Sequence, residues 1–162
     1  FAIGSNIEWA NVTKIIPEKD KTVDVLYSCH MFEHLEREEA LSFLKESRRV
    51  LKKGGVIRLV VPCLMKQVKK YIEDEDADKF VTESMLSTKI PEKIFEKIKY
   101  LLIGERNHKW MYDGNSLSKI LKDSGFITPN ILAPGETSII EPGILDLSER
   151  SSESVYVEAE NP

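Results

Sequence analysis

The sequence lacks the features that define several large classes of protein. It has no apolar run long enough to span a membrane and no signal-peptide pattern at its start. It has no long basic run, and its net charge of −4 argues against a nucleic-acid partner. Its 162 residues, 41% hydrophobic and 31% charged, are typical of one soluble globular domain. We therefore expect a single domain over residues 1–162 that has no membrane span.

Cysteine is scarce as well, because only Cys29 and Cys63 are present. Two cysteines fit a reducing compartment, so we predict a cytoplasmic protein. Each follows or ends an apolar run that we interpret as a strand. The pair could form a disulfide, supply half of a metal site, or be two reduced side chains that line a crevice, and the last interpretation is the simplest.

The best-defined stretch of the sequence predicts a strand, a helix and a second strand. The apolar runs Val23–Ser28 and Val56–Val61 are typical of strands that are buried on both faces of a parallel sheet. Between them, apolar residues recur at helical spacing from Ala40 to Leu51, with acidic residues first and basic residues last. Gly54-Gly55 is predicted to end this helix and to turn the chain into the second strand.

The rest of the chain predicts further helices, then two more strands. Asn11–Ile16 is interpreted as a brief extended piece, and Pro62 ends the second strand. A helical insert is expected over residues 62–112, with helices at 63–71, 79–86 and 91–103. Asp113 is a predicted N-cap for a helix over 114–124. Strands are expected at 126–132 and at 154–158, the last one antiparallel at or near an edge, with a long loop between them.

The motif with the strongest chemical suggestion is H-x-x-E-H, formed by His30, Glu33 and His34. On one helix these residue types bind zinc in peptidases. Because His30 ends a strand, it is not expected to share a helical face with His34, and we predict no metal site. Two interpretations stay open: Glu33 and His34 brace the following helix, or His30 faces a ligand crevice. Ligands of open α/β sheets bind outside the carboxyl ends of the strands, which favours such a crevice at Ser28–His30.

Several blocks in order resemble the class I S-adenosylmethionine-dependent methyltransferases. They are VDVLYSCHMFEHL, RRVLKKGGVIRLVVP, HKWMYDGNSLSKILKDSGF and PGILDLSERSSESVYVEA. The first resembles a D-x-x-Y-S-x-H-x-x-E-H-L signature of small bacterial-type enzymes. The resemblance implies a Rossmann-like α/β sheet, mostly parallel, with helices on both faces. It also implies that the strand at 154–158 is antiparallel and inserted beside the one at 126–132.

The resemblance implies roles for individual residues. Asn11 and Val12 match the pair that brackets the adenine of S-adenosylmethionine, and Ser28, Cys29 and His30 match the stretch under its methionine part. His30 is the predicted base or acceptor-orienting group, because imidazole titrates near neutrality. On the substrate side, the resemblance and the position of the insert favour His108, Trp110 and Tyr112, although an aromatic loop packed on the sheet is an equal alternative. The sequence does not identify the acceptor, and a small-molecule or saccharide-type acceptor is the partner considered.

One departure from the family concerns the glycine-rich turn that follows its first strand. Only 22 residues precede Val23, and they contain no G-x-G. We therefore expect a sheet whose N-terminal part is truncated, with Val23–Ser28 as an exposed edge that favours a homodimer or is covered by residues 1–9. The predicted function is a S-adenosylmethionine-dependent methyltransferase. The alternative is a non-catalytic methyltransferase-like interaction module, or an incomplete fragment, that no longer binds the cofactor.

Overall fold

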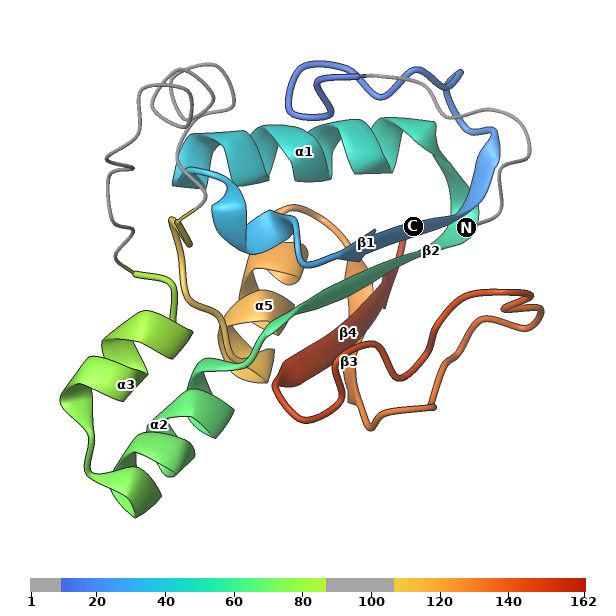
Figure 1. Cartoon of the computed structure of the whole chain (residues 1–162). Coiled ribbons are helices and arrows are strands. Elements are labelled where there is room, and N and C mark those ends of the chain that lie inside the picture. Colours follow the sequence, from blue (N-terminus) through green and yellow to red (C-terminus); the bar gives the residue numbers. More distant parts are fainter. Residues whose placement is uncertain (1–9, 87–106) are drawn as a thin grey trace.

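Four strands form one sheet in the computed structural model, which describes residues 10–86 and 107–162 (Figure 1). The strands are β1 (Val23–Cys29), β2 (Leu51–Pro62), β3 (Ile127–Leu132) and β4 (Ser154–Glu160). The helices are the 3-10 turn η1 (Phe32–His34), α1 (Arg37–Val50), α2 (Leu64–Asp74), α3 (Ala77–Glu83) and α5 (Gly114–Asp123). The predicted helix over 91–103 lies outside the described residues.

The strand order is β1-β2-β4-β3, so the last strand along the chain lies inside the sheet. β1 and β2 are parallel, whereas β4 is antiparallel to both β2 and β3. The predicted insertion of the last strand beside the strand at 126–132 is therefore confirmed, and β4 is second from the edge. β1 is the opposite edge of the described sheet, with β2 as its partner.

Helix α1 follows from its hydrophobic pattern. The side chains predicted to face the core are the ones that the structure buries, among them Ala40, Phe43 and Leu44. The helix begins with a capping box, in which the Glu36 side chain accepts from the backbone of Glu39 and the Glu39 side chain accepts from the backbone of Glu36. Both features are local in sequence, which is why the pattern located the helix correctly.

The end of α1 differs from the prediction. The helix ends at Val50, and β2 begins at once, so that Gly54-Gly55 lies within the strand and not at the helix end. Gly54 has a positive φ of 75°. It lies where the register between β1 and β2 shifts, and not at the end of the helix. The helix end is capped by the fully buried Asn161, whose side-chain nitrogen donates to the carbonyls of Arg48 and Leu51 among others.

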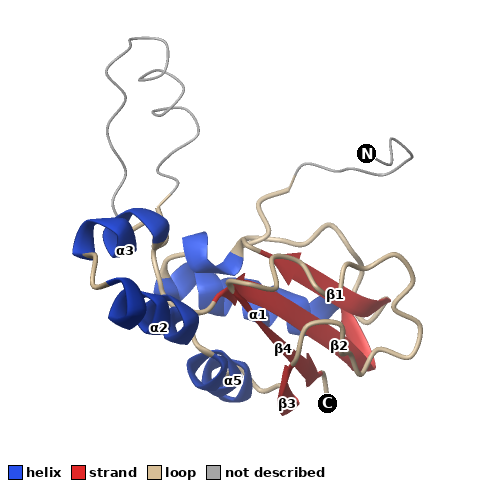
Figure 2. Cartoon of the chain, turned by 60° about the horizontal axis from the view of Figure 1, so that its bottom comes forward, coloured by secondary structure: helices blue, strands red, loops and turns tan. Residues whose placement is uncertain are grey.

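The two faces of the sheet are covered by different kinds of structure (Figure 2). Helices α1 and α5 form one core with the residues that alternate along β2 and β4 toward them, such as Leu59 and Val157. The loop between β3 and β4 lies on the other face, where its backbone meets Arg58. A helical layer on that second face, which the resemblance implies, is not seen within residues 10–86 and 107–162.

Three local predictions have clear outcomes. The N-cap at Asp113 is confirmed, because its side chain accepts a hydrogen bond from the backbone of Ser116 at 2.7 Å. The long loop after β3 is confirmed too. The extended piece at 11–16 is wrong: the amides of Lys14 and Ile15 both donate to the Asn11 carbonyl, which makes a turn.

None of the described helices is long and apolar enough to cross a membrane.

Candidate functional site at the carboxyl edge of the sheet

The parallel strands β1 and β2 end at the same edge of the sheet. Ser28, Cys29 and His30 end or follow β1, and Cys63 follows β2. The His30 amide still donates to the Val60 carbonyl at 2.8 Å, but the residue has a φ of 48°. A residue other than glycine rarely adopts this left-handed conformation, and such strain is concentrated at functional sites. The chain therefore turns sharply at His30, directly at the edge where ligands of such sheets bind.

The His30 ring is held from two sides by residues near the start of β4. Its Nε2 lies 2.8 Å from Ser154 Oγ, and its Nδ1 lies 3.1 Å from an Arg150 guanidinium nitrogen. Because arginine can only donate, Nδ1 accepts, and Nε2–H donates to Ser154. Burial first, and then the charge of Arg150, lowers the pKa of His30 to about 4. His30 is therefore neutral at physiological pH, and the premise that it titrates near neutrality is not met.

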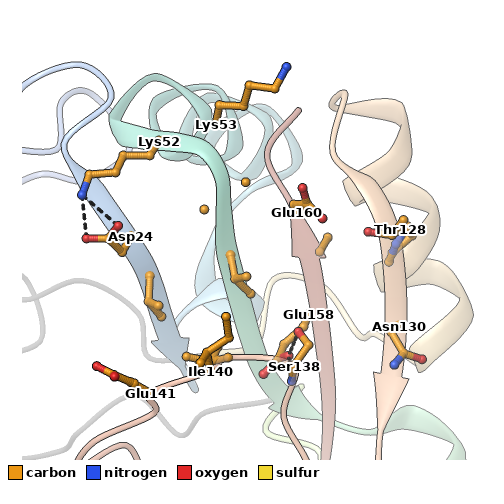
Figure 3. Close-up of a pocket in the computed structure, with 17 residues that line it drawn as sticks. Asp24, Lys52, Lys53, Thr128, Asn130, Ser138, Ile140, Glu141, Glu158 and Glu160 are labelled. Atoms are coloured by element: carbon orange, nitrogen blue, oxygen red, sulfur yellow. Dashed lines mark hydrogen bonds and ion pairs between the residues drawn. The ribbon is translucent and has the colours of Figure 1, made fainter.

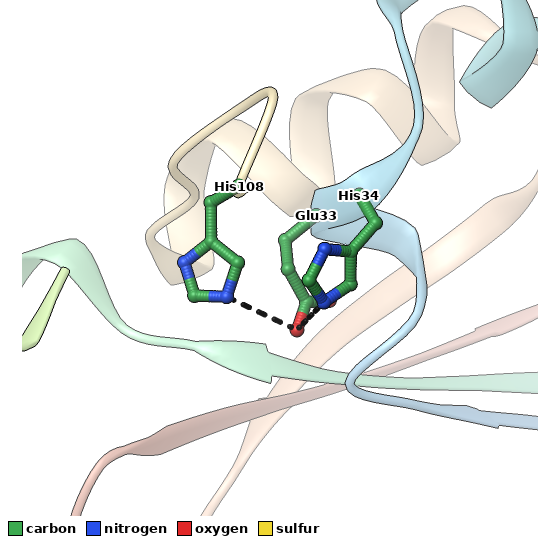
Figure 4. A group of neighbouring side chains, drawn as sticks. All are labelled: Glu33, His34 and His108. Carbon is green, nitrogen blue, oxygen red and sulfur yellow. Dashed lines mark ion pairs between the residues drawn. The ribbon is translucent and has the colours of Figure 1, made fainter. Parts of the chain in front are cut away.

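Glu33 is the deepest polar group at this edge. It is 1% exposed, and neither carboxylate oxygen has a hydrogen-bond partner. Burial raises its pKa to about 7. All three histidines of the chain lie near Glu33 Oε1, with His30 Nδ1 at 3.5 Å and the Nε2 atoms of His34 and His108 at 3.8 Å each. Figure 4 shows Glu33 with His34 and His108. The structure thus brings two predicted regions, His30 and His108, together around Glu33, which the sequence analysis considered as part of the H-x-x-E-H motif and as a brace for the following helix.

The remaining predicted residues at the ends of β1 and β2 have small side chains. Ser28 is buried, and its hydroxyl has no hydrogen-bond partner. Cys29 and Cys63 are free thiols, so they form no disulfide. Neither belongs to the metal-capable group found among the described residues. Burial raises the pKa of the Cys29 thiol, which keeps it protonated.

The three predicted substrate-side residues, at the end of the insert, lie in three different environments. His108 is buried beside Glu33. Tyr112 is 1% exposed and packs against Phe32 with ring centroids 5.2 Å apart, so it belongs to the core. Trp110 is exposed, and the Arg37 guanidinium lies over its ring at 5.1 Å.

The predicted adenine-binding pair lies in a different part of the fold. Asn11 precedes β1 in a segment that runs along α1 (Figure 1), where the Ile16 amide donates to Glu46. The Asn11 side-chain oxygen accepts from the amide and the hydroxyl of Thr13. Val12 packs against the edge of the core. In the described residues, neither Asn11 nor Val12 hydrogen-bonds to the β1 end, so their role stays a prediction.

A hollow of about 1070 Å³ lies at the opposite end of the sheet, where β1 and β2 begin (Figure 3). Its walls include Asp24, Lys52 and Glu160, and Lys52 forms an ion pair with Asp24 across one side. Parallel sheets bind ligands at the carboxyl ends of their strands. We therefore place the candidate site at the other edge, around His30 and Glu33.

Sequence reasoning missed Arg150 and Ser154 as members of this site. Both lie in the block PGILDLSERSSESVYVEA, which contributed to the family resemblance as a whole but named no side chain. Their approach to His30 depends on β4 running antiparallel to β2, because this direction brings the start of β4 to the carboxyl edge.

Comparison with protein families identifies a methyltransferase domain over residues 4–59. This range includes β1, its polar end at Ser28–His30, and α1. Over this part of the chain, the match confirms the resemblance to methyltransferases. The solved structures described next show that the fold is the Rossmann-like fold of S-adenosylmethionine-dependent methyltransferases. No curated protein matches the chain.

Several solved structures of similar fold are described as methyltransferases. A chain in the complex between the Haloferax volcanii Trm112 methyltransferase activator and its methyltransferase is 13% identical over 93% of this chain and 59% of that chain, with a TM-score of 0.54. A S-adenosylmethionine-dependent methyltransferase of Thermotoga maritima is 18% identical over 94% and 62%, with a TM-score of 0.52. One from Aquifex aeolicus is 16% identical over 97% and 55%, with a TM-score of 0.50. This chain therefore spans less than two thirds of each of these structures.

Proposed function

We propose that this chain acts as a S-adenosylmethionine-dependent methyltransferase on a small-molecule or saccharide-type acceptor. The observation that carries the proposal is the polar turn Ser28–His30 at the carboxyl edge of β1, within the segment that matches a methyltransferase domain. The strained backbone of His30 and its two hydrogen bonds hold this turn in one arrangement.

The residues at this turn suit the methionine part of the cofactor. The Ser28 hydroxyl is buried without a partner, so it can donate to a carboxylate or accept from an ammonium group without breaking an existing bond. Cys29 and His30 would lie along the same part of the ligand. Asn11 and Val12 stay the proposed adenine-side pair. When bound, S-adenosylmethionine supplies an electrophilic methyl group on a positively charged sulfur.

His30 is better suited to orient an acceptor than to remove its proton. Its conjugate acid, with a pKa of about 4, holds a proton weakly at neutral pH. Its Nδ1 lone pair is already directed at Arg150. In a displacement that depends mainly on alignment, a rigid neutral imidazole contributes by positioning the attacking atom.

The substrate side is proposed to lie over the same edge. The predicted insert, residues 62–112, would lie on this side; α2 and α3 belong to it, and its residues 87–106 lie outside the described part. Trp110 is exposed at the end of this region and is the side chain best placed to contact an acceptor. His108 and Tyr112 would shape the site from below, because both are buried.

The first test is calorimetric titration of this chain with S-adenosylhomocysteine. We expect binding in the micromolar range, weakened about 5-fold by Ser28→Ala, since one hydrogen bond contributes about 1 kcal/mol. Ser42→Ala, on the exposed side of α1, is the matched control and should bind as the parent does. A parent chain that binds no S-adenosylhomocysteine would contradict the proposal and favour a non-catalytic interaction module. Unchanged binding by Ser28→Ala would place the cofactor away from this turn.

A homodimer through β1 accompanies this proposal. β1 is the edge of the described sheet, and an edge strand is a template for pairing with a second chain. Solution scattering at several concentrations should give the mass of a dimer. A concentration-independent monomer would contradict the dimer and leave the proposed activity untouched.

A further inference from the structure

A second feature of the carboxyl edge is independent of methyl transfer. Glu33 and His34 come from η1, and His108 comes from the end of the insert, 74 residues further along the chain than His34. One ligand atom from each lies within 4.8 Å of the other two. Figure 4 shows the two imidazole rings pointing at the same carboxylate oxygen.

The hydrogen bonds of the two imidazoles fix which nitrogen carries the proton. His34 Nδ1 lies 3.1 Å from the Asn107 carbonyl oxygen, and His108 Nδ1 lies 2.8 Å from the Ser84 carbonyl oxygen. A carbonyl can only accept, so both Nδ1 atoms donate. In the neutral rings, both Nε2 atoms then present lone pairs, and both face Glu33 Oε1. Histidines that bind metals are commonly held in this way, with the second nitrogen donating to a backbone carbonyl.

Neither His34 nor His108 accommodates Glu33 through a hydrogen bond. Its distances to the Nε2 atoms of His34 and His108 are 3.8 Å, which is longer than a hydrogen bond, whichever group holds a proton. Its two oxygens are buried without donors. A buried carboxylate without a partner is costly, and a bound cation removes that cost. Two lone pairs and a carboxylate oxygen therefore converge on a space that contains no positive group from either ring.

The backbone around the three ligands is already organised. The amides of Lys109 and Trp110 both donate to the Glu33 carbonyl, and the His108 amide donates to the Met85 carbonyl. These bonds join the segment that carries His108 to both η1 and the end of α3. The ligands therefore do not depend on a distant rearrangement to meet.

We propose that Glu33, His34 and His108 bind a divalent transition-metal ion, and that Zn²⁺ is the natural occupant. Two imidazoles and one carboxylate form the ligand set of catalytic zinc sites that keep an open position. A tetrahedral Zn²⁺ with bonds of about 2.1 Å separates its ligand atoms by roughly 3.4 Å. The two distances of 3.8 Å to Glu33 need only a small contraction, and the three atoms, which lie within 4.8 Å of one another, would have to draw closer together around the ion. The His34 side chain, one third exposed, gives water access to the fourth position.

His30 is excluded from this ligand set although it lies equally near. Its Nδ1 accepts from Arg150, and its Nε2 donates to Ser154. Both ring nitrogens are thus engaged, and a cation at Nδ1 would face the Arg150 charge. The third histidine of the chain is therefore an internal control for the other two.

The test is Zn²⁺ binding by the chain after removal of any affinity tag and dialysis against EDTA. Titration with ZnCl₂ followed by calorimetry, with elemental analysis after gel filtration, should give one ion per chain. We expect His34→Ala and His108→Ala each to weaken binding at least about 100-fold. His30→Ala should retain the affinity of the parent within a few fold, because it keeps all three ligands. Co²⁺ in place of Zn²⁺ should give the intense visible absorption of a four-coordinate site.

Circular dichroism and thermal unfolding in EDTA establish that each variant is folded before its affinity is compared. Absence of stoichiometric Zn²⁺ on the parent chain would overturn the proposal. Equal Zn²⁺ affinity of the parent and of a folded His34→Ala/His108→Ala double variant would overturn it as well. Because no cofactor is present in these measurements, their outcome is separate from the outcome of the S-adenosylhomocysteine titration.

Discussion

Glu33 and Glu158 are both about 1% exposed, yet the structure treats the two carboxylates in opposite ways. Glu158 accepts four hydrogen bonds, from Arg58, from the hydroxyl of Thr137, and from the amide and hydroxyl of Ser138. Glu33 accepts none. Although burial opposes it, the set of donors lowers the pKa of Glu158, whereas burial raises the pKa of Glu33 to about 7.

The difference separates a structural carboxylate from one that is available for chemistry. Glu158 joins the middle strand β4 to Arg58 on β2 and to the loop that covers this face of the sheet. Its carboxylate is fully hydrogen-bonded to residues of the sheet and of this loop. Glu33 has imidazole rings around it and accepts no hydrogen bond, and a buried carboxyl with a strongly shifted pKa of this kind is a mark of functional sites.

The largest effect on the free energy of unfolding should come from breaking the ion pair between Arg58 and Glu158. Glu158→Gln leaves the fully buried Arg58 guanidinium without its counter-charge, and we expect a loss of about 3–5 kcal/mol in the free energy of unfolding. Glu33→Gln, measured in EDTA, should change that free energy by less than about 1 kcal/mol, because no donor loses its partner. Urea denaturation of both variants checks the comparison. Equal losses would show that the two carboxylates are equivalent.

A pH series should sharpen the same contrast. The folded pKa of Glu158 lies below its unfolded value, so its contribution is complete above about pH 4.5 and is lost as the pH falls through the folded pKa. The difference in unfolding free energy between the parent and Glu158→Gln should thus be constant from pH 7 to about 5 and shrink below that. Denaturation midpoints at each pH measure it. A difference that instead grows on acidification would contradict the assigned direction.

The smallest effect concerns a single donor. Ser138→Ala removes one of the four hydrogen bonds to Glu158 and should cost about 1 kcal/mol of unfolding free energy. Ser152→Ala, on an exposed turn of the same loop, should change it by less than about 0.5 kcal/mol. Thermal unfolding of the two variants and of the parent measures both changes. A cost as large as that of Glu158→Gln would mean that the loop, and not the carboxylate, holds this face together.

The sequence predicted the parts of the fold whose causes are local. The helical spacing from Ala40 to Val50 and the N-cap at Asp113 act over a few residues, and both are confirmed. The parallel pair β1 and β2 follows from two apolar runs and a crossover helix. The resemblance, and not the pattern, supplied the place of β4 within the sheet.

The parts that escaped prediction depend on contacts between distant residues. Asn161 ends α1 from more than a hundred positions away, so the glycine pair looked like the cap. Arg58 is a charged residue within the apolar run of β2, but nothing in the sequence pattern paired it with Glu158. The H-x-x-E-H motif was judged on His30 and His34, whereas the structure replaces His30 with His108. His108 can approach Glu33 only because the end of the insert packs against η1, and the spacing of residues in the sequence does not predict this contact.

The position of β4 also sets an order for folding during synthesis. Ser154–Glu160 follows every other described strand along the chain, yet it lies between β2 and β3. A ribosome releases β1, α1 and β2 long before β4, so β2 has an unpaired inner edge while the rest of the chain is made. Such an edge can pair with another nascent chain. The sheet closes only when β4 emerges, and the same step brings Ser154 to His30 and completes the carboxyl edge.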